Sequence, residues 1–583
     1  MTKQVITLLS HGVAVHDPCP HLANQLVNKI NSTLYEPVLE KNYNQWVVGN
    51  GRPYFYIDKQ ANTYYYHREF LENIKMCIQA SQDAGRVTNV EYIEAGVSEG
   101  VDVVYKNYKF DLRVNDEESR FFFQNEVSDT AVKPENTQTI FEIQTGRGKT
   151  KTFQKVQVRL GKRTVIIVRP AYVKKWKYDC VDDEGGLYEP SPRVRVVSGV
   201  AGIDNVLRDG IDGELDRKNI STILIPTTSL MLWLEEYSNR PHRDGIELSK
   251  FYEYLGAGLV GYDEIHEHFL TVYLSGVILN PPKLVEMSAT LKPSAKKEFH
   301  RLRYAERFPM HNRVDVPYIR VCDIAFIYYS ILVNKMRNRV NGMSMYNHKT
   351  FEAYLYQHCM IDDYFDMIYD LMQRAYFAKY QKGQRVLVFF SMIQTCTDFT
   401  EYLKRRVKED GFGDFDIVRY VDKDKFEDLQ ACDIGVSSPE KAGTAIDLPG
   451  LVLALVTPAI SDRQKNEQIA GRPRTVTQWE NVTPKVLFMH CRELKKHNAY
   501  LNERMSSLAH VAKSMDVING GYQIEGKETV NYKLSPETNG GKTPVKTKAK
   551  QALNKFRKKQ QKQQWKDRRN KVRNKHRSNR RGR

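Results

Sequence analysis

The chain of 583 residues has few cysteines and no long apolar run. Its eight cysteines lie far apart without a Cys-x-x-Cys pair, so neither a disulfide framework nor a zinc ribbon is expected, and reduced thiols in the cytoplasm are favoured. The longest strongly apolar stretch, residues 451–460, is too short to cross a bilayer and contains Pro458. The N-terminus lacks an Ala-x-Ala-like cleavage site. We therefore expect a soluble cytoplasmic protein without a secretory signal or a membrane partner.

Net charge is also missing from most of the chain. The formal charge of +18 comes from 88 Lys and Arg against 70 Asp and Glu, yet residues 541–583 hold 19 basic residues and one acidic residue. Residues 1–540 are therefore neutral. The last 43 residues have too few large apolar side chains to build a core, which predicts a disordered basic tail. Nucleic-acid phosphates are its expected partner, with Trp565 available to stack on a base. A solvated charge run or a localisation signal is the alternative.

Short β-branched runs bounded by Gly, Pro, Ser or Thr recur from residue 139 onward. Near-continuous apolar strands that alternate with helical stretches indicate parallel sheets covered on both faces. Two sets of runs, separated by a helix-rich stretch over about residues 296–383, predict an α/β fold with two domains. The expected strands are 139–143, 164–168, 222–225, 258–262 and 283–287, and then 385–390, 416–420, 433–437, 451–457 and 485–490.

The first 115 residues have a different composition. They are rich in Tyr, Phe and Asn, and Gly49-Asn50-Gly51 is a hairpin-like signal. We interpret them as a separate, small accessory domain. After about Leu508 the α/β pattern decays, and the Gly and Pro residues that follow predict a flexible linker to the tail.

A glycine-rich loop, QTGRGKT over residues 144–150, follows the first expected strand and precedes a stretch that can continue as a helix. Such a loop presents backbone N–H groups and the positive end of the helix to phosphates. Lys149 would reach the β- and γ-phosphates of ATP, and the Thr150 hydroxyl would bind Mg²⁺. The full Walker pattern has Gly or Ala where this chain has Ile143, so the TGxGKT core carries the prediction. The expected nucleotide-binding residues here are Thr145, Gly146, Arg147, Gly148, Lys149 and Thr150.

Two carboxylates end the expected strand 258–262, in the sequence Asp263-Glu264-Ile265-His266. In a parallel sheet, ligands bind at the carboxyl ends of the strands. Asp263 is therefore expected to hold Mg²⁺ near Thr150, and Glu264 to orient the attacking water.

These segments, in this order, resemble motifs of superfamily 2 helicases of the DExH type. Residues 145–150, 263–266 and 288–290 resemble motifs I, II and III. Residues 386–391, 443–449 and 468–472 resemble motifs IV, V and VI. The resemblance covers about residues 116–500. It implies two tandem RecA-like domains, residues 116–300 and 301–508, after an accessory domain of residues 1–115 and before a linker of residues 509–540 and the tail.

The resemblance also implies roles for single residues. Gln124, which follows an aromatic run, would read the adenine edge. Strand-end segments near Arg169 and Thr227 would contact the nucleic-acid backbone without reading bases. The resemblance further implies that Gly443, Asp447 and Gln468 bind the nucleotide and that Pro170 and Thr228 contact the nucleic acid. It also implies that His266, Ser288 and Thr290 couple the two sites.

Motif VI departs from the pattern of its relatives. They commonly carry a second arginine three positions after the first, whereas this chain has Arg472-Pro473-Arg474. A guanidinium from the second domain would stabilise the phosphoryl transition state, and either arginine could supply it.

The function that the resemblance implies is an ATP-dependent DNA helicase or translocase that acts on duplex or branched DNA in replication or recombination. Aromatic and glycine residues over 43–57 resemble the N-terminal module of phage UvsW-type recombination helicases. An RNA helicase, or a non-enzymatic nucleic-acid-binding or annealing protein with a vestigial ATP site, remains the alternative.

Overall fold

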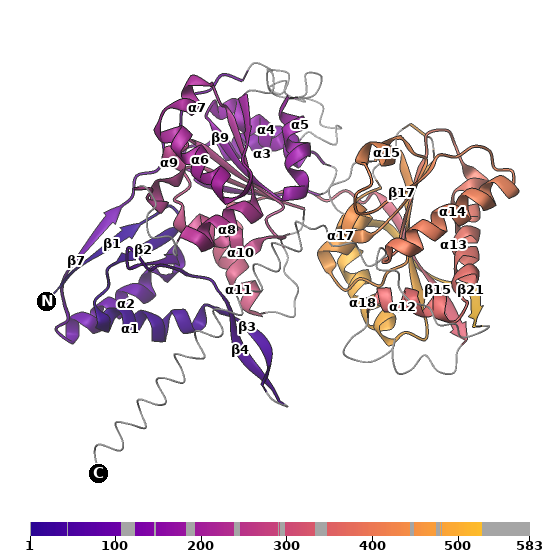
Figure 1. Cartoon of the computed structure of the whole chain (residues 1–583), viewed down its shortest axis with the longest axis horizontal. Coiled ribbons are helices and arrows are strands. Elements are labelled where there is room, and N and C mark those ends of the chain that lie inside the picture. Colours follow the sequence, from indigo (N-terminus) through magenta and orange to yellow (C-terminus); the bar gives the residue numbers. More distant parts are fainter. Residues whose placement is uncertain are drawn as a thin grey trace, which may run out of the picture.

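A computed structural model describes residues 2–42, 45–105, 123–144, 147–181, 193–237, 245–289, 291, 298–332, 347–443, 448–473, 478–479 and 481–526 (Figure 1). The predicted tail, residues 541–583, lies outside these ranges. Six residues with predicted roles also lie outside them: Thr145, Gly146, Thr290, Asp447, Arg474 and Trp565. Their roles stay predictions.

The first α/β domain is built on a seven-stranded sheet in which every pairing is parallel. Its strands are β8 (Gln138–Glu142), β9 (Thr164–Val168), β10 (Val194–Val196), β11 (Thr222–Pro226), β12 (Leu259–Asp263), β13 (Leu284–Ser288) and β14 (Arg313–Asp315). The order across the sheet is β10-β11-β9-β12-β13-β8-β14. Every residue of β9, β11 and β13 is buried, because helices cover both faces of the sheet. The helices are α3 (Phe123–Val132), α4 (Lys149–Leu160), α5 (Val173–Val181), α6 (Gly199–Ile211), α7 (Glu214–Arg217), α8 (Thr227–Tyr237), α9 (Phe251–Tyr254), α10 (Phe269–Ile278) and α11 (Glu298–Arg307).

The second α/β domain lies beside the first in Figure 1 and repeats the architecture. Its sheet has the order β17-β18-β16-β19-β20-β15-β21, and all its pairings are parallel. The strands are β15 (Cys322–Leu332), β16 (Arg385–Phe389), β17 (Ile417–Tyr420), β18 (Ile434–Ser437), β19 (Leu451–Val456), β20 (Lys485–Cys491) and β21 (Ala512–Glu525). The helices are α12 (His348–Gln357), α13 (Ile361–Ala375), α14 (Ile393–Glu409), α15 (Phe426–Ala431), α16 (Pro439–Ala442), α17 (Arg463–Ala470) and α18 (Lys495–Leu508).

The predicted fold class is confirmed, and all ten expected strands are present with ends within one residue of the prediction. Two tandem parallel-sheet domains with flanking helices follow an N-terminal unit, as expected of RecA-like domains. Three strands, however, were not expected from the sequence.

First, the stretch 296–383 holds the expected helices, α11, α12 and α13, but also contains β15, which pairs with both β20 and β21. Second, β14 belongs to the sheet of the first domain, so that domain continues past residue 300. Third, residues 512–525 of the predicted linker 509–540 form β21, the edge strand of the second sheet. The register of β21 shifts where Tyr328 and Tyr329 pair with Asn519 and Tyr522. The intervening Gly520-Gly521 forms a bulge in the strand, where pairing with β15 overrides local propensity.

The N-terminal domain is a five-stranded sheet with the order β5-β6-β2-β1-β7. Its elements are β1 (Thr2–Leu8), β2 (Gly12–His16), α1 (Pro20–Lys29), β5 (Tyr56–Asp58), β6 (Thr63–His67), α2 (Leu71–Asp83) and β7 (Val87–Glu94). A separate hairpin of β3 (Tyr35–Asn42) and β4 (Gln45–Pro53) extends away from the domain (Figure 1). The predicted turn signal Gly49-Asn50-Gly51 lies inside β4 and not at the turn.

The N-terminal domain packs on α10 of the first α/β domain. The ring of Tyr54 contacts Tyr273 at a centroid distance of 5.2 Å, and His67 stacks on the same tyrosine at 5.5 Å. The buried apolar residues of the two domains form one continuous cluster. Within the described ranges, no helix has the length and apolarity to cross a membrane.

Candidate nucleotide site between the two α/β domains

The glycine-rich loop leads into α4 through a backbone turn that glycine accommodates. Gly148 has φ of +82°, in the left-handed region, and caps the helix that begins at Lys149. A side chain at Gly261 would place its Cβ 2.4 Å from the ring of Phe153, so the missing side chain lets α4 pack closely on β12. This packing brings the start of α4 to the carboxyl end of β12, where Asp263 and Glu264 follow.

The carboxylate of Glu264 faces the loop lysine. Its Oε1 lies 3.2 Å from Nζ of Lys149, and the two side chains are only 14% and 11% exposed. Glu264 has φ of +50°, a strained conformation for a residue with a side chain, as is frequent at functional sites. Burial acts to raise the pKa of Glu264, but the charge of Lys149 and its contact with the carboxylate outweigh burial and hold the pKa below its usual value. Glu264 is therefore ionised at neutral pH.

Asp263 is held by a residue that the sequence analysis missed. The Nε1–H of Trp176, on α5, donates to Oδ2 of Asp263 at 2.7 Å. Burial, followed by the charge of Glu264, raises the pKa of Asp263 to about 6. The two adjacent carboxylates thus differ in proton affinity.

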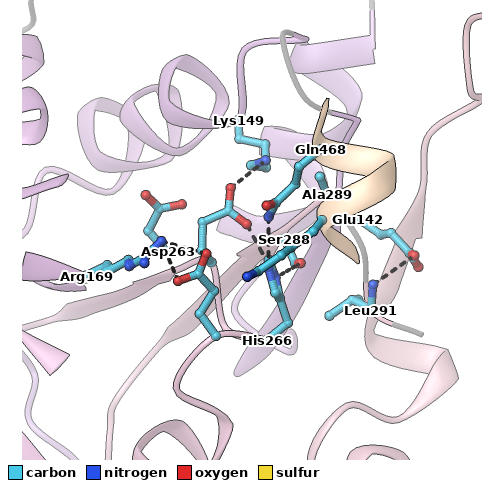
Figure 2. A network of polar contacts seen from close by, with 12 residues as sticks. Glu142, Lys149, Arg169, Asp263, His266, Ser288, Ala289, Leu291 and Gln468 are labelled. Atoms are coloured by element: carbon cyan, nitrogen blue, oxygen red, sulfur yellow. Dashed lines mark hydrogen bonds and ion pairs between the residues drawn. The ribbon is translucent and has the colours of Figure 1, made fainter. Parts of the chain in front are cut away.

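His266 joins the two α/β domains. Its Nδ1 lies 2.8 Å from Oγ of Ser288, at the end of β13, and its Nε2 lies 3.1 Å from Nε2 of Gln468 on α17 (Figure 2). Burial lowers the pKa of His266, so the ring is neutral. The contacts then assign the tautomer: Nδ1–H donates to Ser288, and Nε2 accepts from the Gln468 amide. Three residues predicted from separate motifs therefore form one chain of hydrogen bonds.

The oxygen and nitrogen groups at this site fit Mg²⁺ bound together with a nucleoside triphosphate. Oxygen ligands suit Mg²⁺, which needs few from the protein because phosphates and waters supply the rest. Asp263 offers a carboxylate at the strand end, and Thr150 offers a hydroxyl in the first turn of α4. Oε2 of Glu264 is buried and accepts no hydrogen bond from the residues that the structure describes, although Nδ1 of His266 lies 3.4 Å away, so it can accept one from a water molecule. Lys149 supplies a cation for phosphate oxygens.

Gln124 and Arg147 contact one another at the loop. Nε2 of the buried Gln124 lies 3.4 Å from the carbonyl oxygen of Arg147. The guanidinium of Arg147 packs on the ring of Phe123, 4.4 Å from its centroid, and donates to the carbonyl oxygen of Pro317. The side chain of Arg147, predicted to bind the nucleotide, is thus engaged with the segment that connects the two domains.

A second missed residue, Gln144, holds the same connecting segment. Its amide donates to the carbonyl oxygen of Ile319 at 2.9 Å and accepts from the Ile319 N–H at 3.0 Å. The Tyr318 hydroxyl donates to the carbonyl oxygen of Ala289, next to Ser288. The ends of β8 and β13 are therefore tied to the interdomain segment. The sequence showed Gln144 beside the loop but not its partner 175 residues away.

Arg472 is buried in the second domain. Its Nε and Nη2 donate to the carbonyl oxygen of Gly443, at 3.3 and 3.0 Å. The guanidinium thus links predicted motifs V and VI, and its charge also acts to lower the pKa of Glu264 across the domain boundary.

The residues predicted to contact nucleic acid occupy two strand ends. Arg169 follows β9 and forms an ion pair with Glu267 at 2.6 Å; Pro170 begins the short 3₁₀ turn after it. At the end of β11, Thr227 is buried and Thr228 is exposed. A cleft of about 280 Å³ opens between the domains and is lined by Arg169, His266, Glu267, Asp462, Lys465 and Gln468.

No family model matches the sequence, and no curated protein matches it. Solved structures with similarity include a fragment of a putative HsdR subunit of a type I restriction enzyme from Vibrio vulnificus YJ016, at 10% identity and a TM-score of 0.44, covering 86% of this chain and 97% of that one. The Pyrococcus furiosus Hef helicase domain matches at 11% identity and 0.39, over 69% and 100% of the two chains. T4 UvsW matches at 12% and 0.29, over 89% and 100%.

These likenesses are distant, with TM-scores below 0.5. The assignment of the fold rests on the strand order and parallel register of this chain. In its two parallel-sheet domains and in the order of its motifs, the chain resembles superfamily 2 helicases.

Proposed function

We propose that this protein is a nucleic-acid-dependent ATPase of the superfamily 2 helicase type, which uses ATP and Mg²⁺ to translocate on or remodel duplex or branched DNA. The observation that carries the proposal is the hydrogen-bond chain from Ser288 through His266 to Gln468. This chain connects the carboxylates at the end of β12 to the second domain, as a motor that closes and reopens around a nucleotide requires.

The chemistry follows from the charged groups at the loop. Mg²⁺, held by Asp263 and Thr150, would neutralise charge on the phosphates. Lys149 exchanges its ion pair with Glu264 for phosphate oxygens, which frees the carboxylate. Glu264 then orients the attacking water and receives its proton. The finger arginine is Arg472 or Arg474, and Arg472 must leave the Gly443 carbonyl to reach a phosphate.

The choice of DNA rests on the predicted UvsW-type N-terminal module, and the basic tail suits any phosphate backbone. We propose that the tail increases affinity for nucleic acid without choosing sequence. Deletion of residues 541–583 should then weaken binding and reduce its salt dependence while sparing ATPase activity at saturating DNA. The proposed site of action is the cytoplasm, where the eight free thiols would stay reduced.

The test compares ATP hydrolysis with single-stranded DNA, forked DNA and RNA of equal length. We expect the largest stimulation with forked DNA and its loss in Lys149→Ala. Lys250→Ala is the matched control, because Lys250 and Glu247 form a surface ion pair at the same 3.2 Å. A larger response to RNA would identify an RNA helicase. A protein that binds nucleic acid but does not hydrolyse ATP under any of these conditions would be a non-enzymatic binding protein.

A further inference from the structure

Trp176 lies on α5, the helix that directly follows the segment predicted to contact nucleic acid. Its side chain is buried, with 1% of the residue exposed, and its one polar atom donates to Asp263 at 2.7 Å. The ring lies 5.9 Å from that of Phe153 in an edge-to-face contact. Phe153 belongs to α4, one turn beyond Lys149, and packs on Gly261 two residues before Asp263. The indole is therefore fixed by packing as well as by its hydrogen bond.

The same part of the chain touches the carboxylate segment at a second point. Arg169, at the end of β9, forms its ion pair with Glu267, four residues after Asp263. Only the 3₁₀ turn 170–172 and the first residues of α5 separate Arg169 from Trp176. Residues 169–176 therefore contact both ends of the segment 263–267.

A buried indole N–H that donates to a carboxylate restricts the orientation of that carboxylate. Partners of this kind, one shell removed from a metal, commonly change metal affinity about 10- to 100-fold when they are removed. The bond engages Oδ2 of Asp263, which leaves Oδ1 for another partner.

We propose that Trp176 is a positioning residue that orients the Asp263 carboxylate for Mg²⁺ and ties this ligand to the nucleic-acid segment that begins at Arg169. The proposal rests on the proposed function, since it assigns Mg²⁺ to Asp263. Trp176 touches neither substrate nor metal and acts through Asp263.

A purely structural tryptophan provides the matched control. Nε1 of Trp233, on α8, donates to Oδ1 of Asp204 at the same 2.7 Å, and Trp233 is also fully buried. Its neighbours are Tyr237 and Phe251, in the core of the first domain. Trp233→Phe therefore removes the same type of bond at a comparable depth, away from Asp263.

The experiment measures metal-dependent nucleotide binding without turnover. Polarisation of methylanthraniloyl-labelled ADP is recorded as Mg²⁺ is raised, for the full chain, Trp176→Phe and Trp233→Phe. We expect the half-saturating Mg²⁺ concentration to rise about tenfold in Trp176→Phe and to change less than twofold in Trp233→Phe. Binding of the labelled ADP in excess chelator should be the same in all three proteins.

The possible failures are distinguishable. A wild-type chain that binds no labelled ADP at any Mg²⁺ concentration contradicts the proposed function itself. A wild-type chain with metal-dependent binding, matched within twofold by Trp176→Phe, overturns only the role of Trp176. Equal losses in both tryptophan variants would show a general effect of core substitution and also overturn it.

A second variant covers the case in which Trp176→Phe fails to fold. Benzothienylalanine at position 176 keeps the shape of the indole but replaces the N–H with sulfur. The same tenfold rise in half-saturating Mg²⁺ is expected for it, with a far-ultraviolet spectrum equal to that of wild type. An unchanged Mg²⁺ requirement in this variant overturns the proposal.

Discussion

Nε2 of His266 lies 3.1 Å from Nε2 of Gln468, in a hydrogen bond between the two α/β domains. His266 also contacts Glu264, with Nδ1 3.4 Å from Oε2, and Ser288. A movement of α17 relative to β12 must therefore either move the imidazole or break its bond to Gln468. The imidazole is thus placed to transmit the separation of the domains to the carboxylate that we propose to act on water.

This arrangement predicts that His266 and Gln468 act as a pair. His266→Ala and Gln468→Ala should each lower nucleic-acid-stimulated ATPase activity about tenfold, and the double variant should lose little more. The coupling energy from the double-mutant cycle should be about 1 kcal/mol. His268→Ala, two residues along the same segment, is the control. Losses that simply add would show that the two residues act independently.

Glu264→Gln should keep nucleotide binding and slow hydrolysis by about 10²-fold or more, the usual contribution of a positioned base. The amide has nearly the same size as the carboxylate but cannot take a proton from water, and it removes the charge that pairs with Lys149. Single-turnover hydrolysis and labelled-ADP binding separate the two effects. Glu247→Gln, the surface partner of Lys250, is the control. Normal hydrolysis in Glu264→Gln would place the base elsewhere.

The sequence predicted the strands that are apolar throughout and missed those whose stability comes from pairing. All residues of β9 and β19 are buried and β-branched or aliphatic. A continuous apolar run in the local sequence therefore indicates each strand and its two ends. In β21 most side chains are exposed, and only the partner β15 makes it a strand. The order of the motifs predicted that Asp263 and Glu264 would lie at the glycine-rich loop, and the ion pair of Lys149 with Glu264 lies there. Trp176 and Asp263 lie 87 residues apart in the sequence. No local sequence pattern indicates that this tryptophan and this aspartate are in contact.

The second domain contains a pair of buried neutral histidines. The rings of His348 and His497 stack at 5.9 Å, and Nδ1 of His497 accepts the N–H of Cys491 at 3.0 Å. Burial, followed by the charge of Arg504, lowers the pKa of His348 to about 3, and burial also lowers the pKa of His497. Glu352 lies 3.5 Å from His348, but burial raises its own pKa to about 7, so it offers little charge in acid.

These histidines predict that the second domain loses stability as the pH falls. Their folded-state pKa values lie below the unfolded value near 6.5, so the unfolded chain binds more protons below that pH. Each histidine should therefore lower stability by about 1.4 kcal/mol per pH unit as the pH falls below 6.5. Glu352 acts in the opposite direction, because its raised pKa makes the folded state take up a proton below about pH 7, and it offsets about one of the two histidines. Urea unfolding at pH 7.5, 6.5 and 5.5 measures the effect. His348→Phe should remove the share of one histidine from this loss of stability, whereas the exposed His311→Gln should not. A slope unchanged by His348→Phe would contradict the assignment.

Gly12→Ala should separate the N-terminal domain from the first α/β domain. A Cβ at Gly12 would lie 2.0 Å from the carbonyl oxygen of Val277 on the buried helix α10, so β2 and α10 could not keep their contact. We expect destabilisation of about 2–4 kcal/mol and faster proteolysis between the domains, with labelled-ADP binding retained. Gly96→Ala is the matched control: its carbonyl oxygen accepts from Asn280 at the same interface, but a Cβ there meets nothing within 4 Å. Equal melting temperatures and proteolysis rates for the two variants would show that this contact does not hold the domains together. Loss of ADP binding in Gly12→Ala alone would instead make the N-terminal domain part of the nucleotide-binding unit.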